Sequence, residues 1–341
     1  MISILRKIWD NKWLLRAMVS GRIPPPPFAI IDPANICNLR CPFCPTGTGT
    51  LKMPRRIMEL NEFKIILDKL VSVRQLTLHN WGEPLLNPAL PDMIRYAKQK
   101  GQTVSFDTNL AMPVKKEQME ALISSGLDEI TVSLDGASQG TYEKYRRGGQ
   151  FERVLGNLKL LMEVKNSLGQ ATPVVTWKFI VNRFNEPEIE TARQMAREIG
   201  VLFNLSPMGI PAELQPTWAP QAAYRIIKKK GISHPRSICI WMFRFIVVSS
   251  DGSVLPCCVV QDSQYSCGNL LTQDFDDIWN GPQYRRSRSL MVPVLFRPRS
   301  TAPNPCVACC EYSTLAGAIR TRIADARIRR RPDDKGRGMT K

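Results

Sequence analysis

The order of apolar and polar positions predicts alternating strands and helices over residues 28–205. Short apolar runs, typical of buried strands, occupy residues 28–32, 75–79, 103–107, 129–134, 174–181 and 201–205. Apolar residues spaced three and four apart, as on one face of a helix, occupy residues 61–71, 90–100, 115–125, 151–164 and 186–199. Repeated strand–helix units with short connections indicate right-handed crossovers and a parallel sheet.

The same pattern divides the chain into five segments. Residues 1–23 are an N-terminal amphipathic segment in which residues 2–18 are predicted to form a short, imperfect helix, and the prolines that follow enforce an extended path into the first strand. The six strand–helix units occupy residues 24–207, a proline-rich linker 208–236, a cysteine-rich module 237–315 and a basic tail 316–341. A chain of 341 residues is long enough for one large α/β domain and one small domain.

Charge and hydropathy narrow the cellular context. The net charge of +17 suits nucleic acid, an anionic membrane surface or an acidic substrate, or simply belongs to solvated tails, which we favour. The N-terminal segment lacks the clean apolar core of a signal peptide and is too short and too charged to span a bilayer. We therefore expect a cytoplasmic protein, with a peripheral membrane contact at most. The sequence has ten cysteines, and those that are clustered should bind metal rather than form disulfides.

Three cysteines directly after the first predicted strand carry the strongest chemical signal. Cys37, Cys41 and Cys44 have the spacing C-x3-C-x2-C, with the aromatic Phe43 just before the third. Three thiolates on one short loop can hold three corners of a [4Fe–4S] cluster and leave the fourth iron open to a small molecule. A closed cluster or a zinc site with a fourth ligand elsewhere is the alternative.

This spacing, together with Phe43, resembles the radical S-adenosylmethionine (SAM) superfamily. The resemblance implies a partial (β/α)6 TIM-like barrel in which the open iron chelates SAM. It also implies reductive cleavage of SAM to methionine and a 5′-deoxyadenosyl radical. Gly82, Glu83 and Pro84 match the family's GEP motif, which lines the methionine end of SAM. Trp81 stands where the family often has a second glycine.

Four further polar positions are candidates for contacts with SAM. Asn109 and Ser133 end the third and fourth strands, where barrels of this kind place their chemistry, and are assigned to the ribose and carboxylate of SAM. Arg146, or its neighbour Arg147, is a candidate partner of the SAM carboxylate, unless both belong to a solvated basic surface. Lys178 lies among apolar strand residues and points either into the barrel toward a ligand or to its outer face.

A second group of cysteines follows the linker. Cys239 precedes an apolar run, an Asp-Gly turn and Cys257, which predicts a β-hairpin with these two cysteines on adjacent strands. Cys306 and Cys309 then form a C-x2-C pair. Four cysteines suffice either to saturate one [4Fe–4S] cluster or to bind one structural zinc ion.

This arrangement resembles the domain called SPASM in its full form and twitch in its short form. The resemblance implies one auxiliary [4Fe–4S] cluster held by Cys239, Cys257, Cys306 and Cys309. The full form continues with further cysteines, but position 315 is leucine, so a second auxiliary cluster is not expected. Three cysteines remain: Cys258, Cys267 and Cys310. Each is expected to be a small buried hydrophobic residue, unless Cys258 or Cys310 replaces one of the four ligands.

Together the resemblances imply a radical SAM oxidoreductase. After hydrogen abstraction, loss of a proton and of one electron to the auxiliary cluster would leave the substrate oxidised, with a reductant such as flavodoxin or ferredoxin supplying the SAM-binding cluster. About 27 residues precede the first strand, which favours a small-molecule or carrier-bound substrate over one that needs its own recognition domain. The alternatives are a maturase of a peptide or protein side chain, and a basic metal-cluster protein that binds nucleic acid, a partner we do not expect.

Anaerobic reconstitution of the whole chain should load about eight irons, as two cubane clusters require. Iron and sulfide analysis measures this number. About four irons together with one zinc would make the second module a structural zinc site. About twelve irons would require a third cluster built with the remaining cysteines.

Overall fold

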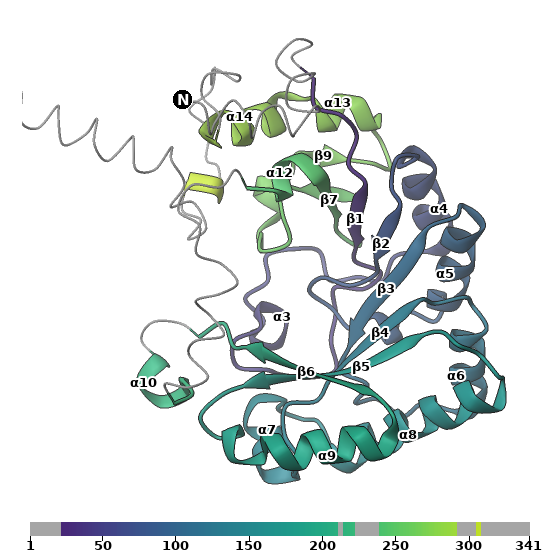
Figure 1. The fold of residues 1–341 in the computed structure, drawn as a ribbon. Helices are drawn as coiled ribbons and strands as arrows, with labels where there is room; N and C mark the ends of the chain where they lie inside the picture. Colours follow the sequence, from purple (N-terminus) through teal and green to yellow (C-terminus); the bar gives the residue numbers. More distant parts are fainter. Residues whose placement is uncertain (1–21, 211–213, 222–238, 292–304, 308–341) are drawn as a thin grey trace, which may run out of the picture.

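The computed structural model describes residues 22–210, 214–221, 239–291 and 305–307 (Figure 1). The predicted amphipathic segment up to residue 21, much of the predicted linker, Cys309, Cys310 and the basic tail lie outside these residues. Within the described ranges, every helix is too short or too polar to span a lipid bilayer.

Nine strands form one sheet in the order β6-β5-β4-β3-β2-β1-β7-β8-β9. Their bounds are β1 Phe28–Ile31, β2 Gln75–Thr77, β3 Thr103–Thr108, β4 Glu129–Ser133, β5 Val174–Val181, β6 Leu202–Pro207, β7 Phe245–Val248, β8 Ser253–Leu255 and β9 Gly268–Asn269. The strands β1 to β6 pair in parallel, each with the next along the chain. Among the described strands β6 is an edge and does not pair back to β1, so the predicted α/β fold with a partial (β/α)6 barrel is confirmed.

The helices that connect the barrel strands cover the outer face of the sheet (Figure 1). They are α4 Leu60–Lys69, α5 Leu90–Gln99, α6 Lys116–Ile123, α7 Gln139–Tyr145, α8 Phe151–Ser167 and α9 Ile189–Ile199. The sequence pattern did not predict α7, because Tyr142 is its only buried residue. The short elements are α3 Pro45–Thr48, α10 Gln215–Trp218, α12 Trp241–Arg244, α13 Phe275–Trp279, α14 Pro282–Met291, and the 3-10 turns η1 Pro84–Leu86, η2 Glu186–Glu188, η4 Ser263–Tyr265 and η5 Pro305–Val307.

The two faces of the barrel strands differ in polarity. On β3 and β5, residues such as Phe106 and Trp177 are buried under the helices, whereas the alternate residues Asp107 and Lys178 are only partly buried. Asp107 and Lys178 therefore share the inner face of the open barrel. A hollow of about 180 Å³ lies on this face, lined by Phe28, Ala29, Gln75, Thr77, Thr103, Ser105, Glu129 and Phe245. Of the two orientations that the sequence left open for Lys178, the structure has the one in which the side chain points into the barrel.

The second cysteine module extends the barrel sheet. β7 pairs in parallel with β1 over its whole length, from Phe28 opposite Phe245 to Ile31 opposite Val248. β7 and β8 form the predicted antiparallel hairpin, with Gly252 at a φ of 81° in its turn. The prediction that Cys239 and Cys257 lie on adjacent strands is wrong. α12 separates Cys239 from β7, and Cys257 follows the end of β8.

Candidate active site and auxiliary cysteine group

The three motif cysteines lie on the loop between β1 and α3, at the carboxyl end of β1. Cys44 is the residue before α3, and Gly47 within α3 lies directly against Cys41, where a Cβ would stand 2.6 Å from the Cys41 backbone nitrogen. Burial raises the pKa of the Cys37 thiol to about 12, and the nearby Cys41 and Cys44 raise it further. Thiols in such a place ionise only when a metal centre replaces the proton.

The donor set supplies one thiolate for each of three irons of a cubane. Among the described residues, no three His, Cys, Asp or Glu side chains are close enough to share one metal ion. A [4Fe–4S] cluster binds each thiolate through a different iron, so its ligands stand farther apart than those of one ion. Cys37 also accepts weak hydrogen bonds from the backbone N–H of Leu39 at 3.4 Å and the amide of Asn109 at 3.5 Å. Donors of this kind stabilise negative charge on the sulfur.

The GEP segment, residues 82–84, packs against the start of the cysteine loop. A Cβ on Gly82 would stand 1.6 Å from the carbonyl oxygen of Ala34, so only glycine fits there. The Glu83 backbone N–H donates to the Ile36 carbonyl at 2.8 Å. This contact joins the cysteine loop, five residues after β1 ends, to the segment after β2.

The carboxylate of Glu83 turns into the protein. It is 2% exposed and accepts hydrogen bonds from the Thr108 hydroxyl at 2.6 Å, the Asn109 N–H at 2.8 Å and the Leu85 N–H at 3.1 Å. Burial raises the pKa of this carboxyl, and the three hydrogen bonds act against that shift. Glu83 therefore fixes the end of β3 to the GEP segment. Its neighbours Gly82 and Pro84 shape the same turn.

Asn109 and Arg146 both reach the motif cysteines. The Asn109 amide lies between Cys37 and the side chain of Asn38. Arg146 donates from Nε to the buried Asp135 at 2.6 Å, and its charge lowers the pKa of the Cys41 thiol, which burial raises. Arg147 is exposed, so the structure favours Arg146 over Arg147 as the arginine of the site.

An aromatic group that the sequence did not predict adjoins Phe43. The Trp218 ring of α10 lies 4.9 Å from Phe43, edge to face, and Tyr145 lies 5.8 Å from Phe43. Trp218 also contacts Phe184, at 5.0 Å. The segment that leaves the barrel toward the second module is therefore packed on the cysteine loop. No sequence spacing links these four residues.

A polar group on the inner face forms around Lys178. Its ammonium donates to the carboxylate of Asp107, and Ser133 is paired with Lys178 across β4 and β5. His79 accepts the Asp107 backbone N–H at 3.0 Å, and its Nε2 lies 3.8 Å from the carboxylate. Burial lowers the pKa of His79. Burial by itself would raise the pKa of Asp107, but the neighbouring His79 and Lys178 outweigh it and hold the pKa of Asp107 below its usual value. His79 and Asp107 were not predicted as site residues, although both end strands.

The second group brings together three of the four predicted ligands. Burial raises the pKa of the Cys257 thiol, and Cys258, Cys306 and Cys239 are close enough to raise it further. Cys267 is close enough to Cys306 for the same effect. Cys258 thus stays a possible substitute ligand, because Cys309 lies outside the described residues.

Trp81 joins the two cysteine groups. Its indole N–H donates to the Val260 carbonyl at 2.9 Å, three residues after Cys257. An apolar cluster on the inner side of β1, β7 and β8 comprises Ile30, Met53, Val247, Leu255 and Val260, and Trp81, Cys257 and Cys258 pack on it. The tryptophan that departs from the family's usual glycine therefore links the GEP segment to the auxiliary cysteines.

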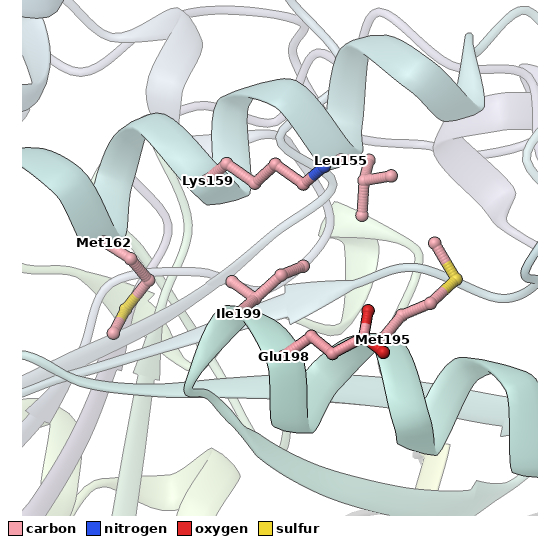
Figure 2. A pocket seen from close by; sticks show the side chains of 6 residues that line it. All are labelled: Leu155, Lys159, Met162, Met195, Glu198 and Ile199. Carbon is pink, nitrogen blue, oxygen red and sulfur yellow. The ribbon is translucent and has the colours of Figure 1, made fainter.

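A larger groove lies elsewhere, between α8 and α9 (Figure 2). Its volume is about 350 Å³, and it is lined by Leu155, Lys159, Met162, Met195, Glu198 and Ile199. It lies on the helix side of the sheet and contains none of the predicted site residues.

Comparisons with known proteins agree with this geometry. Residues 31–181 match the Radical SAM superfamily model and residues 239–310 match SPASM, an iron–sulfur cluster-binding domain, which together cover more than half of the chain. The chain is similar to an AdoMet-dependent heme synthase of Methanosarcina barkeri, with 27% identity over 84% of this chain and 88% of that protein. It is also similar to a PqqA peptide cyclase of Gluconobacter oxydans, with 24% identity over 84% of both chains.

Solved structures share the fold. SuiB of Streptococcus suis bound to S-adenosylmethionine has a TM-score of 0.65 at 16% identity, covering 91% of this chain and 78% of that one. The enzyme anSMEcpe with bound AdoMet has a TM-score of 0.57 at 14% identity, covering 85% and 88%. The open barrel and two cysteine groups define a cluster-dependent α/β-barrel enzyme. The chain belongs to the radical SAM superfamily and carries a C-terminal SPASM domain, which imply [4Fe–4S] clusters and SAM as cofactors.

Gly82→Ala should destabilise the protein by on the order of 3 kcal/mol, because the added Cβ would overlap the Ala34 carbonyl and displace the cysteine loop. Gly140→Ala is the matched control, since nothing lies within 4 Å of a Cβ there and alanine favours helix α7. Urea unfolding measures both. Equal stability of the two variants would contradict the packing described here.

Replacing Cys37, Cys41 and Cys44 together by alanine should abolish formation of 5′-deoxyadenosine while about four irons remain in the auxiliary site. Chromatography of the reaction with SAM and dithionite, with iron analysis of the same sample, tests both parts. Persistent 5′-deoxyadenosine would show that the assignment of these three cysteines is wrong.

Proposed function

We propose that this protein is a radical SAM oxidoreductase that oxidises a small or carrier-bound substrate. The oxidation removes two electrons and two protons, as one hydrogen atom, one proton and one electron. Cys37, Cys41 and Cys44 would hold the SAM-binding cluster. When bound there, cluster and SAM supply a 5′-deoxyadenosyl radical that takes a hydrogen atom from the substrate. The auxiliary ligands would be Cys239, Cys257, Cys306 and Cys309.

The single observation that carries this proposal is the contact between the two cysteine groups. The Trp81 indole bonds to the loop after Cys257, and the backbone of Lys52 exchanges two hydrogen bonds with residues 261 and 263 of the same loop. The auxiliary site is thus attached directly to the segments that surround the motif cysteines. Electron transfer between a substrate radical and the auxiliary cluster requires this closeness.

The chain's own polar residues suit the remaining steps. Asp107 is an ionised acceptor at neutral pH, because its pKa lies below the usual value. It would take the proton that the substrate radical loses as its electron leaves. Lys178 would bind a polar group of the substrate, and Ser133, paired with it on β4, would keep its predicted contact with SAM. His79 fixes Asp107 through the backbone N–H, and Arg146, Asn109 and Glu83 contact the cysteine loop or the end of β3, where they would position SAM.

A maturase of peptides is the second candidate. The relatives named PqqA peptide cyclase and mycofactocin maturase MftC, the latter 24% identical over 82% of this chain, favour it.

The experiment that tests the proposal uses extract from cells grown on deuterated medium. The extract is separated by size into small molecules and peptides and added to anaerobic, reconstituted protein with SAM and dithionite. Mass spectrometry then follows deuterium in 5′-deoxyadenosine and products lighter by two hydrogens. Transfer from the small-molecule fraction supports the oxidoreductase, transfer from the peptide fraction supports the maturase, and transfer from neither contradicts both.

Asp107→Asn and Lys178→Met should lower product formation by about 10²- to 10⁴-fold, the range for loss of a positioned acid or base, while 5′-deoxyadenosine still forms. Lys159→Met is the matched control, because it removes the same charge from the outer groove. The ratio of product to 5′-deoxyadenosine is the measurement. If that ratio is unchanged in both inner-face variants, Asp107 and Lys178 have no part in the oxidation.

A further inference from the structure

Arg288 of helix α14 is a fully buried cation in the SPASM domain. Its side chain is 0% exposed. Nε donates to the Met242 carbonyl at 2.9 Å and Nη1 to the Trp279 carbonyl at 2.6 Å. The third nitrogen, Nη2, is buried and has no hydrogen-bond partner among the described residues. The rings of Trp279 and Tyr284 lie 4.3 and 4.8 Å from the guanidinium carbon.

The charge of Arg288 lacks a balancing carboxylate in the described part of the chain. The groups that act on it electrostatically are Tyr284, Cys267 and Arg285, and none of them is an acid of the Asp or Glu type. Burial lowers the pKa of Arg288 to about 10, so the side chain is still protonated at neutral pH. A buried charge without a partner is strongly unfavourable, and its position in a fold calls for an anion nearby.

The elements that bear the auxiliary cysteines meet at α14. α14 packs against η5, which contains Cys306, and against α12, which starts two residues after Cys239. The Tyr284 hydroxyl donates to the Leu255 carbonyl at 3.3 Å, two residues before Cys257. Arg288 holds α12 and α13 through their backbone carbonyls. Tyr284, whose ring lies 4.8 Å from the guanidinium carbon, is close enough to Cys257 and Cys306 for these thiols to raise its pKa, so Tyr284 stands between Arg288 and two of the proposed ligands.

We propose that Arg288 is the counter-charge of the auxiliary [4Fe–4S] cluster. A cubane with four thiolate ligands is anionic and becomes more negative on reduction. A cation buried beside it therefore favours the reduced state and raises the reduction potential, since net charge and burial set the potentials of such clusters. This deepens the proposed function, on which it rests for the auxiliary ligand set, because a higher potential makes the cluster a better acceptor of the substrate's electron.

The test measures the midpoint potential of the auxiliary cluster in the full chain. The Cys37, Cys41 and Cys44 to alanine background leaves this cluster as the source of the electron paramagnetic resonance signal. In Arg288→Gln the equilibrium constant for reduction should fall at least tenfold, a downward shift of about 59 mV for one electron. Arg288→Lys should restore most of the potential, because it keeps the charge.

Arg285→Gln is the matched control. It removes the same charge from the same helix at an exposed position, where solvent and salt screen it, so the potential should not move. An unchanged potential in Arg288→Gln, or an equal shift in Arg285→Gln, would overturn the proposal.

Arg288→Lys decides the case in which Arg288→Gln loads no cluster. Iron-free Arg288→Gln and Arg288→Lys both lose the fork of hydrogen bonds to the Met242 and Trp279 carbonyls, so thermal unfolding should show both to be less stable than the parent. Only Arg288→Lys keeps the charge, so only Arg288→Lys should then load the auxiliary cluster. If Arg288→Lys also loads no cluster, Arg288 is a packing residue and the proposal is overturned. Failure of the parent chain itself to load an auxiliary cluster would instead remove the electron acceptor of the proposed function.

Discussion

The parallel pairing of β1 with β7 is the constraint on which both cysteine groups depend. β1 ends at the loop that carries the motif cysteines, and β7 follows Cys239 and is the first strand of the hairpin that leads to Cys257. A ladder of backbone hydrogen bonds fixes the register of the two strands and leaves little freedom to slide, because a shift by one residue would turn Ile30 and Val247 away from their shared apolar cluster. The separation of the two groups is thus set by the sheet itself.

Around that sheet, buried polar contacts hold the site in shape before any cofactor binds. Glu83 uses two hydrogen bonds to fix the end of β3, Asn109 reaches back to Cys37, and Asp135 orients Arg146 toward Cys41. Each contact joins the end of one strand to the loop of another. Such preorganisation lowers the reorganisation needed when a cluster and substrate are bound.

Local sequence patterns were enough to predict most strands and helices and the motif cysteines. They did not predict contacts between residues that are far apart in the sequence. The apolar periods predicted six strands and five barrel helices, but α7 has too few buried residues to leave a period. Cysteine spacing identified the motif loop. By contrast, the Asp107–Lys178 pair depends on the register of β3, β4 and β5, and Trp81 meets Val260 across 179 positions. Arg288 could not be distinguished by sequence from its exposed neighbour Arg285, since only packing separates them.

The shared sheet also means that the SPASM domain is not a detachable appendage. Without β7, the N–H and C=O groups of β1 would form an unprotected edge beside the apolar side chain of Ile30. Exposed edges of this kind invite pairing between chains and aggregation. A barrel produced without the second module should therefore aggregate rather than act as a minimal enzyme. Exchange of the second module for another would require that the new module also supplies a strand that pairs with β1.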